Sequence, residues 1–113
     1  MISGQELFAE RERIKQSLDQ SLRKAYENGI EAAEKTRAYR IALKQEELRL
    51  QMDGQAQTTL KDLARGAESV AQAEFEMNVA EVKYKASSEN IMAQKKLLES
   101  VEADIKRELG RSD

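Results

Sequence analysis

The run from residue 63 to residue 105 decides the fold: it reads LARGAESVAQAEFEMNVAEVKYKASSENIMAQKKLLESVEADI. A large apolar or aromatic side chain recurs at every seventh position of this run, at Leu63, Val70, Met77, Tyr84, Ile91, Leu98 and Ile105. Mostly small residues follow three positions later, at Gly66, Ala73, Ala80, Ser87, Gln94 and Val101. A repeat of about 3.5 residues is typical of a helix that supercoils against a partner helix. The second half of the chain is therefore predicted to form a long coiled-coil helix.

The ends of the helices are marked by capping residues. Ser3 and Glu6 match a capping box, and Ile2 with Leu7 matches the hydrophobic staple that accompanies it. Gly54 suits the left-handed position that ends a helix, and Thr59 begins a second Ser/Thr-x-x-Asp/Glu start signal. We predict a helix over residues 4–53, a turn over 54–59 and a helix over 60–109, in a single domain over 1–113.

Two helices of similar length around a short turn predict an all-α antiparallel hairpin. A fold about the turn pairs residues whose numbers add up to 113, so Gly29 lies opposite Tyr84 and leaves room for its ring. In the first half, one row of residues spaced by seven includes Phe8, and a companion row holds Leu18 and Ala25. The predicted hairpin seam consists of Leu22, Leu43, Leu50, Leu63, Val70, Met77, Tyr84, Ile91, Leu98 and Ile105.

A break at Asn28-Gly29 is the structural alternative, because Asn-Gly is a common turn or helix-end pair. The chain would then form a three-helix bundle. No polar linker surrounds the pair, which favours a kink over a reversal of the chain.

Composition excludes several kinds of chemistry. The 113 residues include no Cys and no His, so thiolate and imidazole sites for metals or catalysis are impossible. No Gly-rich phosphate loop is present, and the abundant carboxylates alternate with Lys and Arg as on solvated helix faces. We expect no enzyme, no catalytic residue, no cofactor and no metal. With a net charge of −2 and no long apolar run, we expect a cytoplasmic protein without a membrane partner.

A second set of apolar residues lies outside the predicted seam. Its members are Ile30, Ile41, Leu48, Phe75, Val79 and Val82. A two-helix hairpin has only one mutual seam, so a second apolar strip on each helix needs another cover. These strips predict homo-oligomerisation, with a dimer that forms a four-helix bundle favoured, or binding of another protein. The predicted function is that of a structural or adaptor protein that acts through coiled-coil association.

Arg37, Arg40 and Lys44 share a helix face by their spacing, with Tyr39 beside them. Basic residues next to an aromatic side chain can grip phosphates and stack bases, so an association with nucleic acid is the alternative function. In its small size, helical composition and lack of cysteine, the chain resembles short accessory proteins of phages and prophages. That resemblance implies the same alternative, a small accessory protein that binds nucleic acid through basic helix faces.

Overall fold

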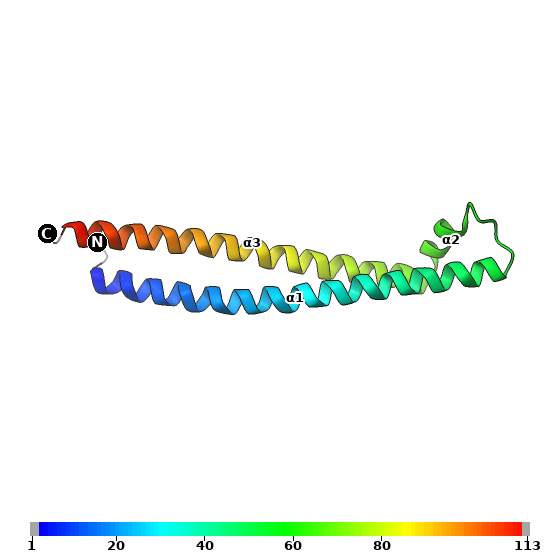
Figure 1. The fold of residues 1–113 in the computed structure, drawn as a ribbon, viewed down its shortest axis with the longest axis horizontal. Coiled ribbons are helices and arrows are strands. Elements are labelled where there is room, and N and C mark those ends of the chain that lie inside the picture. The colour runs from blue at the N-terminus through cyan, green and yellow to red at the C-terminus, as the bar shows by residue number, and fades with distance from the viewer. Residues whose placement is uncertain (1–2, 112–113) are drawn as a thin grey trace. The chain divides into compact units, whose positions relative to one another are not determined.

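The computed structural model describes residues 3–111, and within them it holds three helices and no strand. α1 spans Gly4–Met52, α2 spans Leu60–Gly66 and α3 spans Glu68–Arg111 (Figure 1). The predicted all-α helical hairpin is confirmed. Its contacts fall into two units: one joins α1 up to Tyr26 with α3 from Lys85 onward, and the other is the continuous segment Glu27–Tyr84.

The start of α1 is the predicted capping box. The Ser3 amide donates to a Glu6 carboxylate oxygen at 3.1 Å, and the Glu6 amide donates to Ser3 Oγ at 3.2 Å. Two amides that no helical carbonyl could reach are satisfied in this way. Ile2, the other half of the predicted staple, lies outside the described residues.

The alternative with a chain reversal at Asn28-Gly29 is wrong, since α1 runs without interruption through both residues. Asn28 is buried, and a Cβ atom added at Gly29 would lie 3.1 Å from Cε1 of Tyr84. The Tyr84 ring therefore lies close to the space that a side chain at this position would enter. The Gly29–Tyr84 contact that the register predicted is therefore present.

The turn after α1 uses the predicted glycine. Gly54 has a φ of +85°, and the Gln55 amide donates to the Leu50 carbonyl at 3.1 Å. Glycine reaches this left-handed conformation without a steric penalty, and the bond satisfies one of the free carbonyls at the helix end.

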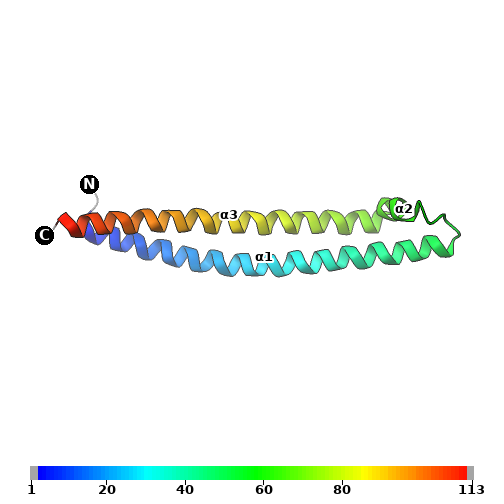
Figure 2. The ribbon, with the colours of Figure 1, turned by 45° about the horizontal axis from the view of Figure 1, so that its top comes forward.

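The segment after the turn differs from the predicted continuous helix over 60–109. Ala67 has an extended ψ of 139° and separates α2 from α3, so that α2 leaves the line of α3 (Figure 2). Gly66, read in the sequence as a small seam residue, instead ends α2, which agrees with its low helix propensity. The break lets α2 bury Leu60 and Ala64. The Thr59 hydroxyl makes no helix cap and donates to the Ala56 carbonyl at 3.1 Å.

The seam of α3 follows the heptad positions. Val70, Ala80 and Ile105 are buried on this row and its companion, with Met77, Ile91 and Leu98 partly buried. Tyr84, over Gly29, keeps a half-exposed ring. Leu63 is also half exposed, because it precedes the break at Ala67 and lies on α2.

In α1, the buried row lies one residue before the predicted one. Leu7 and Ile14 are buried, whereas Phe8 and the predicted seam residue Leu22 are exposed. Leu43 and Leu50 of the predicted row are partly buried. A helix that gains about 100° per residue drifts against a strict seven-residue row, so the row nearest the partner changes along its length.

Polar pairs across the seam show the antiparallel register within each unit. In one unit the Asn90 amide group donates to Ser21 Oγ at 3.0 Å, and that of Gln94 donates to Ser17 Oγ at 3.1 Å. In the other unit, Lys83 pairs with Glu31 at 2.8 Å. The residue numbers of these pairs add up to between 111 and 114, close to the predicted 113.

Candidate functional site

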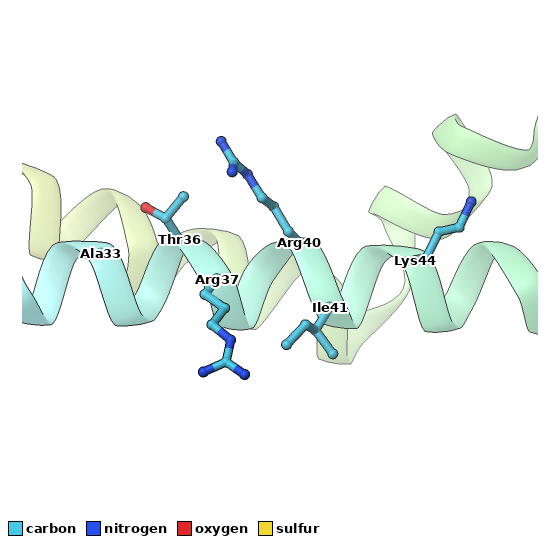
Figure 3. A pocket seen from close by; sticks show the side chains of 6 residues that line it. All are labelled: Ala33, Thr36, Arg37, Arg40, Ile41 and Lys44. Carbon is cyan, nitrogen blue, oxygen red and sulfur yellow. The ribbon is translucent and has the colours of Figure 1, made fainter.

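The predicted basic residues lie around a shallow depression on α1. Its volume is about 500 Å³, and its lining consists of Ala33, Thr36, Arg37, Arg40, Ile41 and Lys44 (Figure 3). Arg40 and Lys44 point to one side of the helix, and Arg37 points to the other with Ile41. The spacing thus brings the three cations to one surface, but their charged ends do not converge on one point.

Tyr39, the predicted aromatic neighbour, is engaged elsewhere. It hydrogen-bonds to Glu74 of α3, and this bond is the largest cause that raises the pKa of Tyr39. The same bond, followed by the hydrogen bond from Arg65 of α2, lowers the pKa of Glu74. The Arg65 Nη2 atom lies 3.2 Å from a Glu74 carboxylate oxygen. This cluster joins all three helices near the turn and engages the Tyr39 hydroxyl with Glu74 of α3.

The six residues of the predicted association strips are all exposed. Ile30, Ile41 and Leu48 on α1 are between 43% and 49% exposed, and Phe75, Val79 and Val82 on α3 are between 43% and 67% exposed. These are large values for apolar side chains with a helical spacing. Tyr26 and Leu97 are further exposed apolar residues that the predicted strips did not include. Their positions between the residues of the seam rows could have indicated that they are exposed.

The two strips lie on opposite outer sides of the Glu27–Tyr84 unit. Ile30 is two residues away from both Asn28 and Ala32, which are buried, so at about 100° per residue it points away from the seam. Val82 comes two residues after the buried Ala80 and faces outward from α3 by the same reasoning. A single compact four-helix bundle cannot cover both strips at once, so each strip needs its own cover.

A second depression, of about 310 Å³, belongs to the other unit. It is lined by Ser17, Gln20, Ser21, Lys24, Ser87 and Asn90. Its hydroxyl and amide groups already bond to one another across the seam, as in the Ser21–Asn90 pair. The depression is therefore explained by the small polar residues of the hairpin itself.

No family model, curated protein or solved structure matches this chain. Among residues 3–111, no three acidic side chains gather where they could hold a metal ion. Over the same residues, no helix carries an apolar stretch long enough to cross a bilayer. The outer faces of α1 and α3 are thus the features from which a function can be argued.

Proposed function

We propose that this chain is a non-enzymatic structural or adaptor protein that acts by helix–helix association, first with a second copy of itself and through its remaining outer face with another protein. One observation carries the proposal: each helix exposes large apolar side chains on the side opposite the hairpin seam. The seam already has its partner within the chain, so these residues serve no purpose in the hairpin itself.

The α3 strip illustrates the energetics. Phe75, Val79 and Val82 follow one another at a spacing of four and three residues, so they form one continuous apolar face. Full burial of such a side chain is worth about 1.5–3 kcal/mol, and these side chains keep about half of their surface in water. A partner helix laid along the strip would recover much of this free energy, as in other complexes in which amphipathic helices pack by their apolar faces.

Binding of nucleic acid is the competing function, and the three cations around one depression support it. Two features weigh against it. The charged ends of Arg37 and Arg40 diverge, and Tyr39 is bonded to Glu74. Phosphate contacts would make retention on single- or double-stranded DNA fall steeply with salt, so a column run at low and moderate salt tests this function directly. Strong, salt-dependent retention would favour it over protein association.

The first test of the proposed function is the solution mass, measured by light scattering on a sizing column from micromolar to millimolar concentration. Self-association predicts a mass of at least twice 12.8 kDa at the upper end. It also predicts a melting temperature that rises with concentration, because only the folded chain associates. A monomer at every concentration, with a melting temperature that does not change, would contradict self-association.

A pair of matched variants asks what the α3 strip does. Val79→Lys with Val82→Lys adds two charges to the strip, and Ser69→Lys with Glu81→Gln makes the same change in net charge at exposed positions of the same helix that lie away from the strip. If the α3 strip carries the self-association, only the first variant lowers the mass to that of a monomer. If neither variant changes the mass, another surface pairs the two copies, and the α3 strip remains for a different protein.

A further inference from the structure

The outer face of α1 carries a stripe of six exposed residues, which we call the outer stripe. Its members are Glu27, Ile30, Glu34, Arg37, Ile41 and Lys44. They follow one another at alternating spacings of three and four residues, which is the spacing of a coiled-coil seam. All six belong to the Glu27–Tyr84 unit, and the stripe faces away from α3. A helix can therefore approach it without opening the hairpin.

The order of charges along the outer stripe is antisymmetric. From the N-terminal end it reads acid, isoleucine, acid, base, isoleucine, base. If a second α1 lies antiparallel with its Arg37 opposite Glu34, its Lys44 meets Glu27 and its Ile41 meets Ile30. In this register every charged position lies opposite one of the other sign, and every isoleucine lies opposite an isoleucine. Lys44, which points away from Arg37 in Figure 3, turns its flexible side chain toward Glu27 to pair.

We propose that the outer stripe is the surface through which two copies of the chain pair, α1 against α1 and antiparallel, around a two-fold axis that passes between Glu34 and Arg37. This inference rests on the proposed function and names the contact that brings the copies together. The two-fold axis repeats each contact once, so the six residues make six layers of one self-complementary interface.

The charged groups of the outer stripe are left without ion pairs by the hairpin. None of Glu27, Glu34, Arg37 and Lys44 forms an ion pair with another residue in the described part of the chain. Their neighbours toward the seam differ, since Glu31 pairs with Lys83, and Lys35 lies 3.8 Å from a Glu76 carboxylate oxygen. These four charges are thus available to pair with a second copy, although other charges of the unit, such as Arg40 and Glu47, also lack an ion pair within residues 3–111.

The apolar members of the stripe fit the same arrangement. Ile30 is 43% exposed and Ile41 is 45% exposed, and Ile41 lies in the depression between Arg37 and Lys44. Contact with the isoleucines of a second copy removes this apolar surface from water. The depression gives the incoming side chain a place to pack.

The register follows from the same six residues. Sliding the second helix by one heptad in one direction sets Arg37 against Ile41, and sliding it in the other direction sets Ile30 against Glu34. Within these six positions, either shift sets a charge against an apolar side chain, which is costly. A nucleic acid would fit the stripe less well than a second copy, because Glu27 and Glu34 would repel its phosphates.

Charge reversal tests the inference directly. Glu34→Arg sets Arg against Arg twice in its own dimer, and Arg37→Glu sets Glu against Glu twice. We expect each variant to dimerise at least about tenfold more weakly than the wild type. An equimolar mixture of the two variants restores opposite charges at both contacts, so native mass spectrometry is expected to show mainly the mixed dimer.

Two further variants test whether the position of the charges, and not the change in net charge alone, accounts for the weaker dimer. Arg40→Glu makes the same change in net charge as Arg37→Glu but lies beside the outer stripe, so its dimerisation is expected to remain near that of the wild type. The double variant Glu34→Arg with Arg37→Glu exchanges the two charges within one chain and is expected to dimerise again. Circular dichroism checks that each variant keeps its helices. Added salt is expected to weaken the wild-type dimer and to strengthen the two single-variant dimers, because it screens attraction and repulsion alike.

The outcomes separate this inference from the proposed function. If the wild type associates and both single variants associate equally well, or if mixing the variants gains nothing, the α1–α1 contact is wrong while association through another surface still stands. If the wild type remains a monomer at every concentration, both the contact and the proposed self-association are wrong. Weak single variants with a strong mixed dimer support the inference.

Discussion

Replacing Gly29 by alanine sets helix propensity against a close ring contact. Alanine in the middle of a helix is favoured over glycine by about 0.5–1 kcal/mol. The new Cβ atom would lie 3.1 Å from Cε1 and 3.4 Å from Cζ of Tyr84, so the ring must move by a few tenths of an ångström. Tyr84 is 45% exposed, which leaves the ring free to move outward. We therefore expect Gly29→Ala to stabilise the protein by about 0.5 kcal/mol, somewhat less than the propensity alone would give.

The assay is urea unfolding followed by circular dichroism, with every variant at one protein concentration so that association contributes equally. Tyr84→Ala supplies the matched background, because without the ring Gly29→Ala is expected to give the full propensity gain of about 1 kcal/mol. The difference between the two backgrounds measures the cost of the contact. Destabilisation by Gly29→Ala of more than about 1 kcal/mol, absent in the Tyr84→Ala background, would show that the ring cannot move and would refute the reasoning.

Three further predictions concern the seam and the cluster near the turn. Val70 is only 1% exposed, so Val70→Ala is expected to cost about 2 kcal/mol in urea unfolding; a cost below about 0.5 kcal/mol would mean that the site collapses around the smaller side chain. Gln94 donates to Ser17 but leaves its buried Oε1 atom without a partner, so Ser17→Ala with Gln94→Leu is expected to raise the unfolding free energy by about 1 kcal/mol, and a loss would contradict this account. Glu74 has a lowered pKa in the folded state, chiefly through its hydrogen bond from Tyr39. The free energy of unfolding that the ionised carboxylate contributes is therefore fully present above the ordinary carboxyl pKa and is lost as the pH falls below it. The stability gap between wild type and Glu74→Gln is therefore expected to shrink from pH 7 to pH 3, and a gap that stays constant would rule out this linkage.

Much of the fold could be predicted because local signals and long-range pattern agree. The capping box at Ser3, the glycine turn at Gly54 and the heptad of α3 each depend on residue types with one strong structural preference. The register followed from the position of the turn, and it placed Gly29 opposite Tyr84, where the structure has the two residues in contact. Each of these features depends on residues that are close in the sequence or on one pair of matching residues, so it can be recognised in the sequence itself.

Other features depended on which of several possible contacts is more favourable in the folded chain, and a sequence does not show this directly. Leu7 and Phe8 are adjacent and both apolar, so periodicity alone could not decide which of them faces α3. The break at Ala67 arises because α2 buries Leu60 and Ala64 by leaving the line of α3, which is a tertiary effect. In the candidate site, spacing correctly placed the exposed apolar strips. It did not show that Tyr39 is bonded to Glu74, because that contact joins helices that are distant in the chain.

The nearly constant sum of paired residue numbers also bears on how the chain folds. Paired residues nearer the turn are closer in sequence: Lys35 and Glu76 are 41 positions apart, whereas Ser17 and Gln94 are 77 positions apart. Closing a short loop costs less entropy than closing a long one, so the pairs form most readily next to the turn and then in succession toward the chain ends. Substitutions near Glu74 should therefore act mainly on the folding rate, and those near Gln94 mainly on the unfolding rate. The two long helices would thus pair first next to the turn, and the polar Ser17–Gln94 and Ser21–Asn90 contacts would form late in folding.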